Sequence, residues 1–106
     1  MFDFFKTKKN YENISSSAFK AMISENPNAV IIDVRTALEF KQGSIPKAIN
    51  IDLMDVNFSQ KITQLAKDKT YLLYCRSGNR SGSACKYMGD NGFEQVYNLS
   101  GGIMSY

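Results

Sequence analysis

The sequence predicts an α/β fold in which a central, mainly parallel β-sheet is flanked by helices on both faces. Short apolar runs suited to buried strands alternate along the chain with segments whose apolar residues recur at helical spacing. Strands that alternate with helices in this way are joined by right-handed crossovers and form a parallel sheet. The length of 106 residues and the hydrophobic fraction of 43 % fit one domain with a single core.

The chain is expected to begin with a flexible arm at residues 1–11 and to form a single domain over residues 12–106. The first helix is predicted to begin within Ser15-Ser16-Ser17, because serine hydroxyls cap helix N-termini. Its inward face consists of four apolar residues at helical spacing: Ala18, Phe19, Met22 and Ile23. Asn26-Pro27 ends this helix, since proline cannot continue it.

Two strands and a short helix follow. Ala29 to Ile32 is an apolar run typical of a buried strand, and Ala48 to Ile51 is predicted to form the next strand. Between them, Thr36 can cap a short helix over Ala37 to Lys41, which Gly43 ends.

The second half of the chain continues the alternation. Phe58, Ile62 and Leu65 fall at i, i+4 and i+7, which predicts an amphipathic helix. Tyr71 to Tyr74 is a buried strand with polar residues before it. A helix over residues 81–88 and a last strand over residues 95–98 complete the domain.

Composition and charge exclude several classes of protein. The formal charge of +3 is modest and the lysines are scattered, apart from Lys6, Lys8 and Lys9, so no nucleic-acid groove is predicted. No run approaches membrane-spanning length and the early charges do not fit a signal peptide, so we expect a cytoplasmic protein without membrane contact. Two cysteines do not make a disulfide framework for a domain of this size.

Cys75 is the candidate nucleophile. It follows a predicted strand and precedes a polar turn into a helix N-terminus, where unpaired N–H groups and the helix dipole favour thiolate over thiol. Gly78 and Asn79 tolerate the dihedral angles that a tight loop needs, and Arg76 and Arg80 add positive charge. The chain contains no histidine, which excludes Ser-His-Asp and Cys-His catalysis and zinc sites with histidine ligands. We therefore expect the backbone dipoles and the arginines to activate Cys75.

The segment from Cys75 to Ser81 is similar to the active-site loop of rhodanese-like sulfurtransferases. Three further segments resemble the family's signatures in order and spacing: residues 31–46, residues 48–51 and residues 98–103. Together they cover the chain from about Ile14 to its C-terminus, which makes the match specific. Ser44 and Lys47 stand where the family commonly has histidine and glycine, and neither position carries the chemistry. Tyr106 stands where the family often has tryptophan.

The resemblance implies that Cys75 is catalytic and that the rest of the loop binds substrate or persulfide: Arg76, Ser77, Gly78, Asn79, Arg80 and Ser81. Arg80 is assigned to anion binding, since a cation at the positive end of a helix is favoured when an anion lies between them. Arg76 is left open between a substrate contact and a surface charge. Cys85 is expected to pack inward beside Met88, with a role as resolving cysteine as the alternative.

Three supporting residues are expected at the edge of the sheet that carries Cys75: Asp33, Arg35 and Glu39. Sites in parallel sheets lie beyond the carboxyl ends of the strands, so the end of the strand at residues 29–32 and Cys75 should share one edge. Asp33 is expected to accept backbone N–H groups there. Arg35 is expected either to pair with Glu39 or to face the mouth of the pocket.

The predicted function is transfer of sulfane sulfur through a Cys75 persulfide, without a metal or an organic cofactor. The expected partners are a small sulfur donor, thiosulfate or a persulfide, and a thiophilic acceptor such as cyanide, a thiol or a protein, with the chain acting as a monomer. One alternative is a phosphatase or arsenate reductase on the same fold, although only four residues separate Cys75 from Arg80, one fewer than in a Cys-x5-Arg loop. The other is a non-catalytic rhodanese-like binding module.

Overall fold

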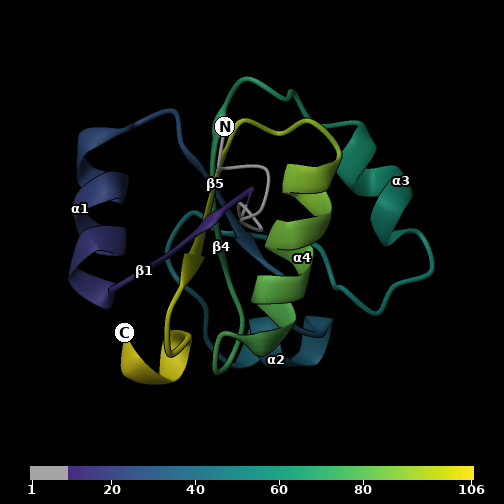
Figure 1. Cartoon of the computed structure of the whole chain (residues 1–106). Helices are drawn as coiled ribbons and strands as arrows, with labels where there is room; N and C mark the ends of the chain where they lie inside the picture. Colours follow the sequence, from purple (N-terminus) through teal and green to yellow (C-terminus); the bar gives the residue numbers. More distant parts are fainter. Residues whose placement is uncertain (1–9) are drawn as a thin grey trace, which may run out of the picture.

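The computed structural model describes residues 10–106 and contains a five-stranded sheet with helices on both faces (Figure 1). Its elements follow in chain order: β1 (Glu12–Ile14), α1 (Ser16–Glu25), β2 (Val30–Asp33), α2 (Ala37–Gln42), β3 (Ile49–Asn50), α3 (Phe58–Thr63), β4 (Thr70–Tyr74), α4 (Asn79–Asp90), β5 (Gln95–Leu99) and the 3-10 helix η2 (Ile103–Ser105). The strands lie in the order β1-β5-β4-β2-β3, and neighbouring strands are parallel. The predicted α/β fold is confirmed.

The central strand β4 is buried on both faces. Its alternate side chains point to opposite sides of the sheet, so Tyr71 and Leu73 pack with α3 and α4, whereas Leu72 and Tyr74 pack with Phe19 of α1. Figure 1 shows this arrangement, with α1 on one side of the sheet and α3 and α4 on the other. A parallel strand covered on both faces requires the continuous apolar run seen in the sequence.

Two helix starts match the capping that the sequence predicts. The hydroxyl of Ser15 accepts the N–H of Ala18 at 3.1 Å and caps α1. At α2, Thr36 and Glu39 form a reciprocal capping box, in which each side chain accepts the backbone N–H of the other residue. The box fixes the position of the Glu39 carboxylate as well as the start of the helix.

Several boundaries differ from those expected. The strand predicted at residues 48–51 is reduced to the two residues of β3, and α4 begins at Asn79 rather than at Ser81. Neither β1 nor η2 was predicted. Because β1 contains only one apolar residue, Ile14, no local pattern marks it, and its pairing with β5 makes it a strand.

Most of the predicted N-terminal arm, residues 1–9, lies outside the described residues. At the end of that arm, Asn10 donates a side-chain hydrogen bond to Asp90 at 2.7 Å. Tyr11 is half-buried and packs against the core beneath α4. The structure thus places residues 10 and 11 in contact with the domain.

The carboxyl ends of β2 and β4 meet at one edge of the sheet. Asp33 lies beside Tyr74 in the strand register, and the N–H of Val34 donates to the carbonyl of Tyr74 at 3.1 Å. The segment after β2 and the loop that begins at Cys75 therefore lie next to each other, as the sequence predicts. This edge carries the candidate site.

Candidate active site

Cys75 lies in a tight loop that leads from β4 directly into α4. The turn depends on Gly78, whose φ of +105° is strained for any residue with a side chain. A Cβ atom at Gly78 would also lie 3.4 Å from backbone atoms of Leu99 and Gly101. The turn brings the first N–H groups of the helix back toward the cysteine sulfur.

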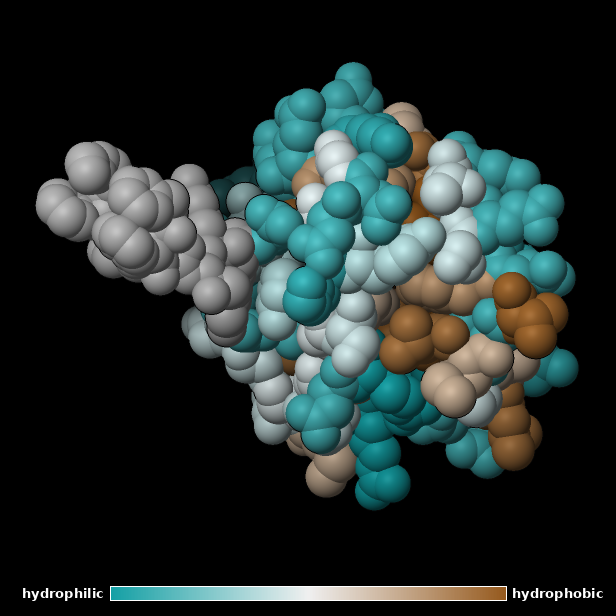
Figure 2. Space-filling model, turned by 45° about the vertical axis from the view of Figure 1, so that its right-hand side comes forward, coloured by the Kyte–Doolittle hydropathy of each residue, from teal (hydrophilic) through white to brown (hydrophobic). Residues whose placement is uncertain are grey.

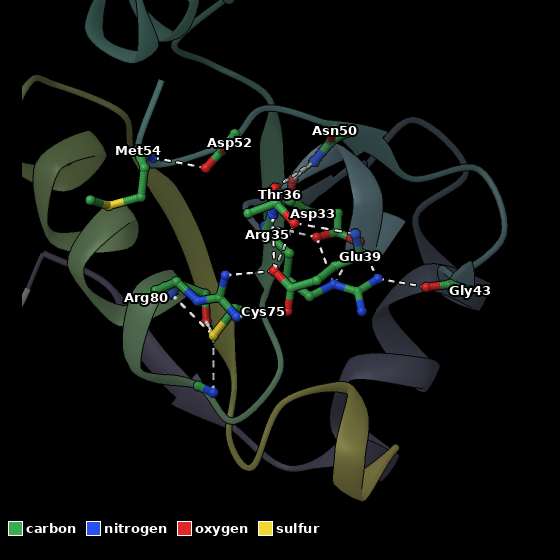
Figure 3. Close-up of polar contacts among 12 residues, drawn as sticks. Asp33, Arg35, Thr36, Glu39, Gly43, Asn50, Asp52, Met54, Cys75 and Arg80 are labelled. Carbon is green, nitrogen blue, oxygen red and sulfur yellow. Dashed lines mark hydrogen bonds and ion pairs between the residues drawn. The ribbon is translucent and has the colours of Figure 1, made fainter. Parts of the chain in front are cut away.

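Three hydrogen bonds point at the sulfur of Cys75 (Figure 3). The donors are the N–H of Gly78 at 3.1 Å, the N–H of Ser81 at 3.4 Å and the hydroxyl of Ser81 at 3.3 Å. Burial raises the pKa of this thiol, since the residue is only 1 % exposed, but these hydrogen bonds together with the Ser77 N–H outweigh burial and hold the pKa below its usual value. The site thus favours a thiolate without a base.

The hydroxyl of Ser81 is an activating group that the sequence reasoning missed. Only backbone dipoles and arginines were expected to favour the thiolate, and Ser81 was assigned to substrate binding. In the structure Ser81 is fully buried in the first turn of α4, with both its N–H and its hydroxyl directed at Cys75. A serine six residues after the cysteine, at the start of the predicted helix, was the available signal.

Arg80 does not extend a free guanidinium toward the sulfur. Its Nη1 and Nη2 atoms donate to the two carboxylate oxygens of Glu39 at 2.8 and 3.0 Å, a bidentate ion pair between α4 and α2 (Figure 3). The pKa of Glu39 falls to about 2, mainly because of the Arg80 hydrogen bonds, with further bonds from Thr36. From the sequence, Arg80 was assigned to anion binding, and Glu39 was not identified as its partner.

Of the two alternatives expected for Arg35, the pairing with Glu39 is wrong. Arg35 forms hydrogen bonds of 2.7 to 3.1 Å to the carboxylate of Asp33 and one of 2.6 Å to the carbonyl of Gly43. Asp33 and Arg35 are two residues apart at the end of one strand, so their side chains share a face and meet there. Asp33 also accepts the backbone N–H of Arg35 at 2.9 Å, which is the structural role expected for it.

The C-terminal segment supports the loop from behind. The N–H of Ile103 donates to the carbonyl of Cys75 at 2.9 Å, and the N–H of Met104 donates to the carbonyl of Arg76 at 3.2 Å. Gly102 lies so close that a Cβ atom there would be 2.2 Å from the Arg76 carbonyl oxygen. The side-chain amide of Asn98, on β5, donates a hydrogen bond to the carbonyl of Gly78 at 3.2 Å. These supports were not identified from the sequence, where the segment was recognised only as a signature.

The remaining loop side chains face solvent. Arg76, Ser77 and Asn79 are exposed, and within residues 10–106 the Arg76 guanidinium has no hydrogen-bond or ion-pair partner. Arg76 and Glu39 border an open groove of about 280 Å³ between α2 and η2, with Met104 on its wall. The structure thus places one unpaired cation beside the loop.

Cys85 lies inside the core on α4, at 0 % exposure and in one cluster with Met88, as expected. Burial raises its pKa far above the usual value, and the nearby Cys75 charge adds to that rise. A buried, protonated thiol of this kind is a packing residue. Both cysteines are free.

The part of the chain that the structure describes contains neither a cluster of metal ligands nor a helix that could span a membrane. No group of three or more aspartate, glutamate or cysteine side chains comes together in a way that could hold a metal ion. The helices there are too short and too polar to cross a bilayer.

Comparison with known proteins gives one consistent answer. The model of the rhodanese-like domain family matches residues 15–106. A Bacillus subtilis protein named "Putative sulfurtransferase YtwF" is 40 % identical over 90 % of this chain and 89 % of its own length. A sulfurtransferase of Allochromatium vinosum is 32 % identical over 88 % of this chain and 85 % of its own.

The chain is also similar to a solved structure and to part of a longer protein. The crystal structure of a rhodanese-related protein from Thermoplasma volcanium superposes with a TM-score of 0.77 at 32 % identity and covers 90 % of this chain and 89 % of that one. A tRNA uridine(34) hydroxylase of Cytophaga hutchinsonii is 35 % identical over 94 % of this chain, which spans only 33 % of that protein's length.

Proposed function

The chain belongs to the rhodanese-like domain family, and on that premise we propose that it is a sulfurtransferase that carries sulfane sulfur as a persulfide on Cys75. The donor is thiosulfate or a persulfide. The acceptor is a thiophilic group: cyanide in an assay, and a thiol or a protein in the cell. Two relatives of nearly the same length are named as sulfurtransferases, which supports this class of reaction.

The proposed reaction has two steps with a covalent intermediate. The Cys75 thiolate attacks the outer sulfur of the donor, the donor's S–S bond breaks, and the leaving group departs with the electron pair, as sulfite from thiosulfate or as a thiolate from a persulfide. The acceptor then attacks the terminal sulfur of the Cys75 persulfide and releases the Cys75 thiolate. Electrons balance without an external oxidant or reductant, and ping-pong kinetics follow.

The observation that carries the proposal is the set of three donors directed at the Cys75 sulfur, from Gly78 and Ser81. They lower the pKa of the attacking thiol and stabilise the thiolate that leaves in the second step. The loop N–H groups also form a nest that can stabilise negative charge on a terminal sulfur, in the manner of an oxyanion hole.

The two alternatives fit the site less well. A phosphatase or arsenate reductase needs a loop that cradles a tetrahedral oxyanion, but the Cys75–Arg80 loop is one residue short of that pattern and Arg80 is occupied by Glu39. A non-catalytic module needs no activated thiol, yet two residues, Gly78 and Ser81, direct hydrogen bonds at Cys75.

The direct test is persulfide formation. The protein is incubated with thiosulfate or with cysteine persulfide, freed of donor and analysed by intact mass for the gain of one sulfur atom, and thiocyanate is measured after addition of cyanide. We expect the parent and Cys85→Ala to gain sulfur and form thiocyanate, and Cys75→Ser to do neither. Sulfur transfer that survives in Cys75→Ser would refute the proposal.

A further inference from the structure

The guanidinium of Arg80, the cation next to the nucleophile, is already engaged by a carboxylate. A guanidinium recognises a dianion best through its two parallel N–H groups, and Glu39 occupies that fork at 2.8 and 3.0 Å. The side chains of the pair are about one-third exposed, at 32 % for Arg80 and 27 % for Glu39, so both face the solvent through which a donor arrives.

Glu39 is held in place independently of Arg80. One of its carboxylate oxygens accepts the backbone N–H of Thr36 at 3.0 Å and the hydroxyl of Thr36 at 3.2 Å, as part of the capping box of α2. A carboxylate anchored in this way cannot swing aside for an incoming anion without breaking the cap of its helix. An anionic donor must therefore compete with Glu39 for Arg80.

The other charged groups near Arg80 add negative charge around its guanidinium. The hydrogen bonds and charge of Glu39 raise the pKa of Arg80, and the charges of Cys75 and Asp52 add to that rise, so Asp52 also acts on this guanidinium. Figure 3 shows Asp52, which precedes α3, above Arg80 in this view. Arg80 thus faces two carboxylates and the Cys75 sulfur, whereas Arg76 has no partner among the described residues.

We infer that Glu39 is a specificity-determining residue, which by occupying Arg80 selects against dianionic sulfur donors such as thiosulfate and in favour of alkyl persulfides. An alkyl persulfide carries a single charge, on the sulfur atoms that enter the loop, so it needs no guanidinium fork. This inference rests on the proposed function and narrows its donor class.

The test is Glu39→Gln, a change that keeps the capping box. Glutamine at the third helical position serves a capping box as glutamate does, so the loop and α2 should retain their geometry while the carboxylate charge is lost. We expect kcat/KM for thiosulfate to rise about fivefold relative to that for 2-hydroxyethyl persulfide, an alkyl persulfide with no second anionic group, as the effect of freeing one partly exposed guanidinium.

Two companion variants isolate the cause. Asp90→Asn changes the net charge by the same amount at the far end of α4, where Asp90 pairs with Lys86, and should leave the donor ratio unchanged. Glu39→Gln combined with Arg80→Ala should lose the gain, because it removes the freed guanidinium. A donor ratio that stays the same in Glu39→Gln, or rises equally in Asp90→Asn, overturns the inference.

A second readout does not depend on sulfur transfer. Iodoacetate is an anion and iodoacetamide is neutral, so the ratio of their alkylation rates at Cys75 measures the selectivity of the site against anions. Glu39→Gln should raise this ratio several-fold and Asp90→Asn should not. Failure of the parent to form a persulfide with either donor would refute the sulfurtransferase assignment, whereas an unchanged alkylation ratio would refute the role of Glu39.

Discussion

The hydroxyl of Ser81 lies 3.3 Å from the sulfur of Cys75 and donates to it, while the N–H of the same serine lies 3.4 Å from that sulfur. One residue in the first turn of α4 therefore supplies two of the donors around the Cys75 sulfur. In a chain without histidine, we propose that these hydrogen bonds favour the thiolate in place of a general base.

Ser81→Ala should raise the pKa of Cys75. The change removes the hydroxyl donor but keeps the backbone N–H, and a hydrogen bond to a charged group is worth about 1.5 kcal/mol or more, so alkylation of Cys75 at neutral pH should slow by about tenfold. The measurement is the pH dependence of iodoacetamide alkylation, followed at Cys75 by mass spectrometry. Ser83→Ala, the same change at an exposed position of α4, is the control. Identical titrations for the parent and Ser81→Ala would contradict the assignment.

The contribution of the Glu39–Arg80 ion pair to the free energy of unfolding should depend on pH. The folded-state pKa of Glu39 is lowered from 4.5 to about 2, so the contribution is complete above about 4.5 and is lost as the pH falls through about 2. In Arg80→Ala the pKa of Glu39 should return toward its ordinary value. Carboxyl resonances in an NMR titration report this directly. A Glu39 resonance that titrates in the parent with a pKa near 4.5 would show that the pair does not form in solution.

Gly102→Ala should destabilise the fold by roughly 3 kcal/mol, because the new Cβ would be 2.2 Å from the Arg76 carbonyl oxygen and φ at this position is +65°. Gly82→Ala is the matched control. It lies within α4, where its Cβ would make only an ordinary contact of 3.6 Å with Asn98, and alanine favours a helix over glycine by about 1 kcal/mol. Urea unfolding compares the two. Equal stabilities of the two variants would mean that Gly102 does not pack closely against the backbone of Arg76.

Cys85→Ala should keep Cys75 reactive and cost about 1 kcal/mol of stability, since it deletes one buried sulfur from the core. Sulfur transfer and the alkylation titration of Cys75 should stay within about twofold of the parent, which corresponds to less than 1 kcal/mol of transition-state stabilisation. Loss of turnover with an intact fold would instead assign Cys85 to the mechanism as a resolving thiol.

Local patterns were enough to locate Cys75 and the strand and helix that position it. The run Tyr71 to Tyr74 has the composition of a strand buried on both faces, and it is followed by Cys75, a glycine and a helix start. Thr36 marks the start of α2 in the same way. Such features are set by residues within a few positions of one another, so they can be read from the sequence.

The partners of the charged groups were decided only by the tertiary structure. Glu39 and Arg80 are separated by 41 positions, and Asn98 reaches Gly78 across 20. From the sequence, Arg35 was the partner considered for Glu39, and Arg80 was not. The sheet decides between them, because Asp33 at the end of β2 captures Arg35 while α2 and α4 bring Glu39 and Arg80 together. Opposite charges attract at any sequence separation, so which pair forms depends on which side chains the packed elements place within reach.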